Sequence, residues 1–149
     1  MSEFSITSED FKEGEEIPKK FGYKFENKQP HIEAHNVPEN AFSIALIMDD
    51  PDAMAAVGKV WVHWLVFDGN SPNFPNGNIA GVLGKGLNDF GEIGYGGPAP
   101  PNGRHTYIFK AYALDNEPDL KKGYSKQELE NAMKGHILAE AKLTGTFTP

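Results

Sequence analysis

Three runs of apolar, β-branched and aromatic residues constrain the fold of this chain more than any other feature. They cover residues 42–48, 60–67 and 107–114. Runs of this length, bounded by glycine, proline, asparagine and aspartate, are typical of buried strands. The second run carries a stronger strand signal than the first. The chain is therefore expected to be mainly β, with these three strands at its centre.

Further elements surround these strands. The segment Ser125-Lys126-Gln127-Glu128 has the form of a capping box, and Leu129 and Met133 follow at helical spacing. Residues 137–147 alternate as a closing strand does, and residues 4–7 form a shorter candidate. Residues 68–103 are rich in glycine, asparagine and proline, so this long region is expected to be functional or to contain short edge strands. The pattern predicts an antiparallel β-sandwich with one short C-terminal helix.

Length and composition narrow the class of protein. A chain of 149 residues fits one domain, residues 1–149. The net charge of -7, without a run of lysine or arginine, argues against nucleic acid and anionic membranes as partners. The absence of cysteine excludes disulfides and a thiol nucleophile. No segment resembles a signal peptide or a membrane span, so a cytoplasmic protein without stable membrane insertion is expected.

Polar side chains occur where apolar ones would stabilise a strand more. Alternation along a strand predicts that His63 shares one face with Trp61, Leu65 and Phe67. It also predicts that His105 and Tyr107 share a face with Phe109, and that Asp50 stands at the end of the first strand. Asp52 follows in the turn, after Pro51.

Each of these residues also has a structural interpretation. A single histidine in a strand is often a core residue, the aspartates are good turn formers, and the tryptophans Trp61 and Trp64 are expected in the core.

Four short motifs in this order resemble those of the phosphatidylethanolamine-binding protein family, which includes Raf kinase inhibitor protein. They are Asp50-Pro51-Asp52-Ala53, Val62-His63-Trp64, residues 97–103 (GPAPPNG) and His105-Thr106-Tyr107. Their spacing is most similar to the prokaryotic branch. The resemblance implies a β-sandwich with Greek-key elements and a small anion-binding pocket at one end.

The resemblance also implies the residues of that pocket. Carried over motif by motif, they are Asp50, Asp52, His63, Gly97, Pro98, His105 and Tyr107. The implied ligand is a small anion or a phospholipid head group such as phosphoethanolamine, with no cofactor. Homodimers, and regulation of a kinase, a protease or another protein partner, are also compatible with the resemblance.

The chain departs from the family pattern in several places, two of which lie in the first and last of these motifs. Met54 stands where the family usually has a second proline, and Thr106 stands where it has arginine, with Arg104 on the other side of the histidine. These changes affect the expected rim of the pocket more than the histidine and tyrosine themselves.

Aspartates near an anion require an explanation. A carboxylate beside a histidine favours the charged imidazolium, so Asp50 and Asp52 are expected to act through His63 or His105. Backbone N–H groups of the glycine-rich loop and the Tyr107 hydroxyl would add donors, and an aspartate would suit the ammonium of phosphoethanolamine.

Three other functions fit part of the pattern. The alternative to anion binding is a metal-dependent enzyme that uses the aspartates and histidines as ligands for zinc or non-haem iron. The others are a hydrolase using the aspartate pair and a protein-interaction role. No nucleophile is evident, because the chain lacks cysteine and a Gly-x-Ser-x-Gly motif. The sequence therefore favours a binding protein over an enzyme.

Overall fold

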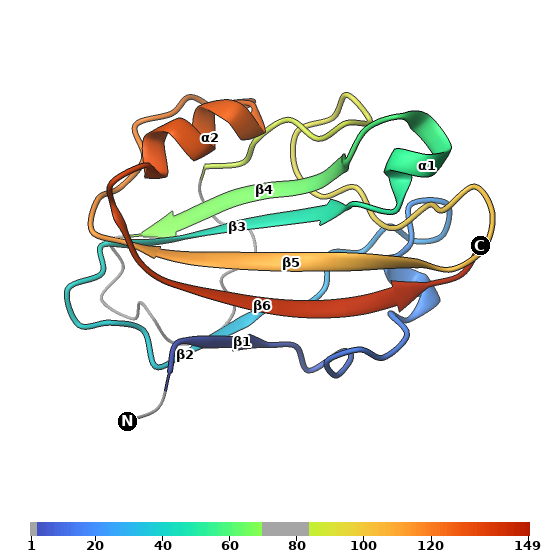
Figure 1. Cartoon of the computed structure of the whole chain (residues 1–149), viewed down its shortest axis with the longest axis horizontal. Helices are drawn as coiled ribbons and strands as arrows, with labels where there is room; N and C mark the ends of the chain where they lie inside the picture. The colour runs from blue at the N-terminus through green and yellow to red at the C-terminus, as the bar shows by residue number, and fades with distance from the viewer. Residues whose placement is uncertain (1–2, 70–83) are drawn as a thin grey trace.

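The main element of the fold is a four-stranded antiparallel sheet with the strand order β4-β3-β5-β6 (Figure 1). The computed structural model describes residues 3–69 and 84–149. The strands of this sheet are β3 (Ser43–Asp50), β4 (Trp61–Gly69), β5 (His105–Leu114) and β6 (Ile137–Phe147). All four predicted strands of this sheet are confirmed, with ends shifted by a few residues.

Smaller elements lie on both sides of this sheet. A two-stranded sheet is formed by β1 (Ser5–Thr7) and β2 (Glu33–His35). The helices are the 3-10 helix η1 (Lys19–Phe21), α1 (Ala53–Val57) and α2 (Lys126–Met133). None of the helices in the described part of the chain has the length and apolar character needed to cross a bilayer.

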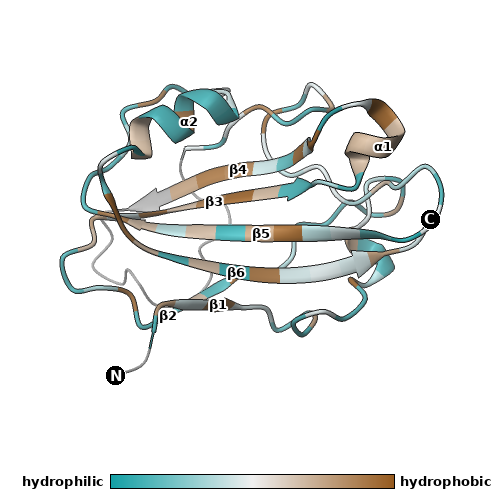
Figure 2. Ribbon diagram, viewed as in Figure 1, coloured by the Kyte–Doolittle hydropathy of each residue, from teal (hydrophilic) through white to brown (hydrophobic). Residues whose placement is uncertain are grey.

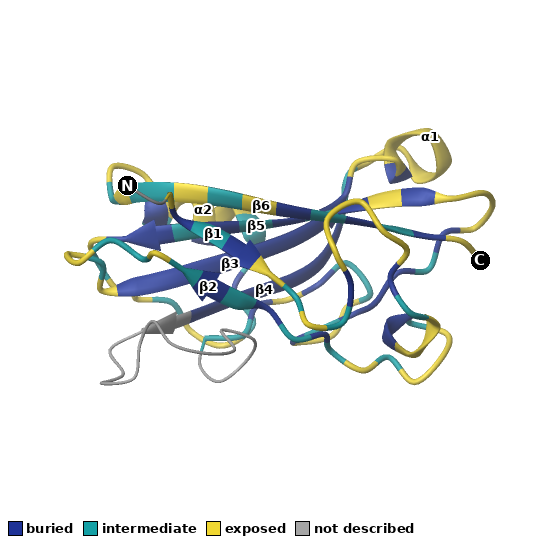
Figure 3. Ribbon diagram, turned by 90° about the horizontal axis from the view of Figure 1, so that it is seen from below, coloured by how far each residue is buried: buried dark blue, intermediate teal, exposed yellow. Residues whose placement is uncertain are grey.

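Strand β3 is buried on both faces, as its apolar sequence predicted. Ile44 and Leu46 belong to a core that includes Ile6 and Ala34 of the small sheet. Ala45 and Ile47, on the opposite face of β3, belong to a second core that also contains Leu129 of α2. The order of layers is therefore small sheet, large sheet and α2, as Figures 1 and 3 show from two directions. The mainly β, antiparallel fold is confirmed, and this layering is consistent with the predicted packing of two sheets.

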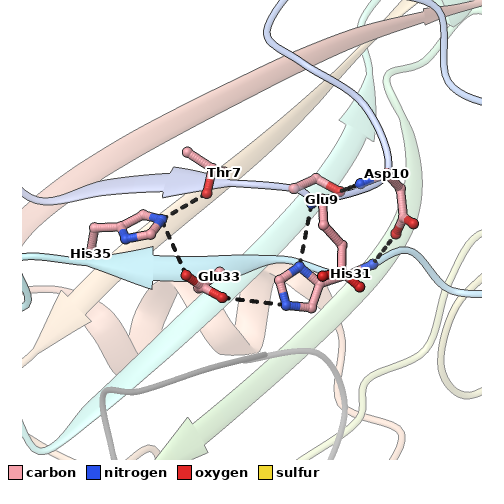
Figure 4. A network of polar contacts seen from close by, with 7 residues as sticks. Thr7, Glu9, Asp10, His31, Glu33 and His35 are labelled. Carbon is pink, nitrogen blue, oxygen red and sulfur yellow. Dashed lines mark hydrogen bonds and ion pairs between the residues drawn. The ribbon is translucent and has the colours of Figure 1, made fainter.

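The small sheet includes a strand that the sequence did not reveal. In β2 only Ala34 is buried, so the strand lacks an apolar run. Its outward side chains make polar contacts instead (Figure 4): His35 Nε2 lies 2.7 Å from Thr7 Oγ1, and Glu33 lies between His31 and His35 at 3.5 and 3.7 Å. A strand held in this way leaves little hydrophobic periodicity to detect.

Residues 84–103 of the long predicted loop contain one isolated bridge, between Leu87 and Ile93. Residues 70–83 of that loop lie outside the described residues.

The predicted capping box of α2 is confirmed. Ser125 Oγ accepts a hydrogen bond from Glu128 N at 3.1 Å, and Glu128 Oε1 accepts one from Ser125 N at 3.0 Å. These bonds satisfy two backbone donors that the helix itself leaves free. We expect Ser125→Ala to lower the free energy of unfolding by about 1 kcal/mol, measured by urea denaturation. Ser125→Thr retains an acceptor and is the control; equal losses in both variants would contradict a capping role.

Candidate functional site

The ends of three strands surround one cavity of about 160 Å³. Asp50 is the last residue of β3, His63 lies near the start of β4, and His105 and Tyr107 lie at the start of β5. All four side chains line this cavity. The structure therefore brings together four of the seven residues that the sequence singled out.

A β-bulge in β4 turns His63 toward this cavity. Met48 pairs with Trp64, but the next residue, Asp49, pairs with Val62, so His63 is one extra residue in β4. An extra residue interrupts the alternation of faces and redirects the side chains around it. The prediction that His63 shares a face with Leu65 and Phe67 is therefore wrong: those two belong to the core beneath α2, whereas the His63 ring lies 5.1 Å from that of Tyr107, centroid to centroid.

Asp50 holds His105 in place. Asp50 Oδ2 lies 2.7 Å from His105 Nδ1, and the two residues are 3% and 7% exposed. Because a carboxylate oxygen accepts, Nδ1 of His105 donates, and only its Nε2 is left for a ligand. The other oxygen of Asp50 accepts from Asp52 N at 2.9 Å, so both oxygens already have partners.

Asp52 has a different place from Asp50. It is exposed, it does not line the cavity, and its Oδ2 accepts from Thr106 N at 2.8 Å. Asp52 therefore ties the turn after β3 to the start of β5.

His63 is fixed through its other ring nitrogen. Its Nδ1 lies 2.7 Å from the carbonyl oxygen of Gly96, which can only accept, so Nδ1 carries a proton. Burial lowers the pKa of His63 below its ordinary value, and the hydrogen bond to Gly96 and the nearby Asp50 oppose this only in part. The resting imidazole is therefore neutral at pH 7, with a lone pair on Nε2.

Tyr107 supplies a neutral hydroxyl. Burial and the negative charge of Asp50 raise the pKa of Tyr107 well above its ordinary value. Its buried oxygen makes no hydrogen bond of good geometry to the described residues. A buried donor without a partner is costly, and a ligand oxygen in the cavity would satisfy it.

Gly97 and Pro98 do not line the cavity. Gly97 N donates to Asn27 Oδ1 at 2.8 Å, and Pro98 O accepts from Tyr23 N at 3.0 Å. Gly96 N donates to the carbonyl oxygen of His63 at 2.9 Å. The hypothesis that these loop N–H groups serve as free anion donors is wrong for Gly96 and Gly97, because both already have partners.

The rest of the lining is apolar, and the sequence did not reveal it. The residues are Ala53, Ala56, Val57, Trp61, Phe90, Ala99 and Pro101. Trp61 was expected in the core, but the bulge pairs it with Asp50 at the cavity; Trp64 is in the core as predicted. The first three of these residues belong to α1, whose signal was missed: alanine-rich sequence followed by Gly58, which caps the helix at φ +77°.

The described residues that line the cavity include no lysine or arginine. No group of three or more histidine, aspartate or glutamate side chains able to hold a metal ion occurs within residues 3–69 and 84–149. The alternative of a metal-dependent enzyme therefore finds no support in the described part of the chain.

Comparison with known proteins identifies relatives over nearly the full length. A family model described as "Phosphatidylethanolamine-binding protein" matches residues 7–148. A UPF0098 protein of Methanothermobacter thermautotrophicus is 44% identical over 138 residues, which cover 88% of this chain and 89% of the relative. A UPF0098 protein of Chlamydia muridarum is 41% identical over 148 residues, and the alignment covers 95% of this chain and 97% of the relative.

Two solved structures have the same fold. The crystal structure of a protein from Chlamydia trachomatis, described as a putative phosphatidylethanolamine-binding protein homologue, has a TM-score of 0.89 at 37% identity and covers 100% of this chain and 99% of that one. The crystal structure of Escherichia coli YbcL, described as a new member of the mammalian PEBP family, has a TM-score of 0.85 at 29% identity, with 99% of each chain covered.

Proposed function

The chain belongs to the phosphatidylethanolamine-binding protein family, and on this premise we propose that it is a binding protein for a small anion, such as the phosphate of a head group. One observation carries the proposal: His63, His105 and Tyr107 line a single cavity beside Asp50. When both imidazoles are protonated, their two Nε2 atoms and the Tyr107 hydroxyl can donate to the oxygens of one anion.

Binding rather than catalysis is part of this proposal, as the sequence favoured. The described residues around the cavity include no serine, threonine, cysteine or lysine that could act as a nucleophile. Homodimers and regulation of a kinase, a protease or another protein partner stay predictions.

The proposal requires a proton on His63. In the resting site Nε2 of this histidine carries a lone pair, which repels an anion, and the described lining has no other cation except His105 when protonated. Because burial lowers the pKa of His63, the proton must be taken up as the anion binds.

Anion affinity is therefore expected to rise as the pH falls. Sulfate is the better probe, because phosphate itself changes charge in this range. We expect the sulfate affinity, measured by calorimetry, to increase from pH 8 to pH 6, with a slope of at most about tenfold per pH unit, the limit for uptake of one proton by His63. An affinity that stays constant over this range would contradict the proposal.

His63→Asn is the matched variant for this experiment. Its amide nitrogen is attached at the same position as Nδ1 of His63 and can donate to the carbonyl oxygen of Gly96 in its place. Asparagine does not titrate, so the pH dependence assigned to His63 is expected to disappear. A pH dependence that survives unchanged would assign the proton to His105 instead.

A further inference from the structure

We infer that the anion in this cavity carries one apolar group of about the size of a benzene ring. The ligand would then be an aryl- or alkyl-substituted phosphate or sulfonate, not an amine-bearing or sugar-bearing one. The inference rests on the proposed function, because it concerns the part of the ligand beyond the anion.

The polar and apolar parts of the lining are separate sets. The polar side chains come from the ends of β3, β4 and β5, as described above. The remaining wall comes from α1 and from Trp61, Phe90 and the loop residues Ala99 and Pro101, with no hydrogen-bonding side chain except the indole. Figure 2 shows that α1 is apolar, whereas most of α2 is hydrophilic. Apart from the indole N–H of Trp61, which has no partner among the described residues, this wall offers the hydroxyl groups of a sugar no partner for the water that they would lose.

The carboxylates of the motif are poorly placed to receive an ammonium group. Each oxygen of Asp50 already accepts a strong hydrogen bond, from His105 and from Asp52 N. Asp52 does not line the cavity. Protonated His63 and His105, which hold the anion, would also repel a second cation nearby. The earlier interpretation that an aspartate receives the ammonium of phosphoethanolamine therefore loses its geometric basis.

Aromatic rings form one corner of the cavity. The ring centroid of Phe90 lies 5.5 Å from that of Trp61 and 5.5 Å from that of His63, with interplanar angles of 68° and 67°. Phe90 itself is fixed by stacking on Tyr23 at 3.8 Å. Such a corner offers ring faces and edges to a further flat apolar group, which aromatic pairs favour.

The size of the cavity limits this group. A dry cavity of about 150 Å³ in another protein holds one benzene molecule. This cavity of about 160 Å³ must also hold the anion, so a ring of that size is only partly enclosed. Two acyl chains of a phospholipid do not fit in such a volume. A ligand held wholly within the cavity is therefore a small, water-soluble molecule rather than a diacyl lipid.

Three sulfonates test the inference, because all are ionised at every pH used. Methanesulfonate has almost no apolar group, benzenesulfonate adds the ring, and taurine adds an ammonium. At pH 6 we expect calorimetry to give an affinity for benzenesulfonate about tenfold above that for methanesulfonate, from partial burial of the ring. We expect taurine to bind no more tightly than methanesulfonate.

Two residues of α1 provide a matched pair of variants. Val57 and Met54 are both 53% exposed, but only Val57 lines the cavity. Val57→Asn is expected to lower the benzenesulfonate affinity about threefold and to change the methanesulfonate affinity less than twofold. Met54→Asn is expected to change neither.

The outcomes separate the two proposals. If sulfate binds with the expected pH dependence but benzenesulfonate is no tighter than methanesulfonate, the inference about the apolar group is wrong and anion binding stands. If taurine binds more tightly than benzenesulfonate, the ligand carries an amine and the inference is also wrong. A third measurement is co-sedimentation of the protein with vesicles of phosphatidic acid in phosphatidylcholine. If the protein binds these vesicles and benzenesulfonate displaces it only weakly, the ligand is a lipid and the size argument is wrong. If no anion binds, the proposed function fails and the inference fails with it.

Discussion

Gly97→Ala is expected to destabilise the protein by about 3 kcal/mol, at the upper end of the cost of overpacking. A Cβ atom at this position would lie 2.0 Å from the carbonyl oxygen of Phe21 and 2.9 Å from Tyr23 N. Both are backbone atoms, so no flexible side chain can move aside. To make room, the loop at Gly97 must move away from the segment 21–27. Two hydrogen bonds now hold these segments together, from Gly97 N to Asn27 Oδ1 and from Tyr23 N to Pro98 O.

The loss should extend to the binding site. The loop that contains Gly97 also carries the Gly96 carbonyl that fixes His63. Displacement of the loop would release the imidazole, so we expect the sulfate affinity to fall together with the free energy of unfolding. Urea denaturation and calorimetry at pH 6 measure the two effects on the same variant.

Gly103→Ala is the control in the same loop region. No atom lies within 4 Å of a Cβ added there, but the residue has φ +65°. Alanine at such an angle costs about 1 kcal/mol through backbone strain alone. Similar losses in the two variants would mean that close approach of the backbones at Gly97 does not determine its effect.

The sequence contained enough information to place the strands and the polar residues, for an identifiable reason. A strand such as β3, buried on both faces, requires a continuous apolar run, and the capping box of α2 requires Ser125 and Glu128 in a fixed spacing. These features are local in sequence. His105 and Tyr107 share a face with Phe109 as predicted, because β5 is regular from its first residue.

The orientation of His63 depended on information that is not local. The bulge exists only as a mismatch in the pairing of β4 with β3, so alternation within β4 assigned its residues to the wrong faces. The same mismatch moved Trp61 from the expected core to the cavity. Phe90 lies far along the chain in a glycine-rich loop, and nothing in its local sequence indicates that it forms a wall of the site.

Asp50→Asn is expected to lower the free energy of unfolding by about 3 kcal/mol, because it removes one partner of a buried, hydrogen-bonded pair. The asparagine oxygen can replace only one of the two carboxylate oxygens that accept from Asp52 N and His105 Nδ1. Its amide nitrogen would then face an N–H group. The conflict is relieved only if Nδ1 of His105 gives up its proton and accepts instead.

This change of tautomer separates an orienting role of Asp50 from a merely structural one. In the wild type, Nδ1 of His105 donates to Asp50, so ¹⁵N NMR of the imidazole should report a protonated Nδ1. In Asp50→Asn we expect an unprotonated Nδ1 and a proton on Nε2. If Nδ1 stays protonated in the variant, Asp50 does not set the state of His105.

Asp52→Asn is the matched control, since it changes the other acid of the same motif. Asp52 is exposed, and an amide oxygen can still accept from Thr106 N. We expect a loss below about 0.5 kcal/mol, the usual range for a surface substitution, and no change in the His105 tautomer. An equal loss at both positions would mean that the motif acts through the geometry of its turn. A large loss at Asp50 alone would mean that the buried acid acts through the histidine beside it.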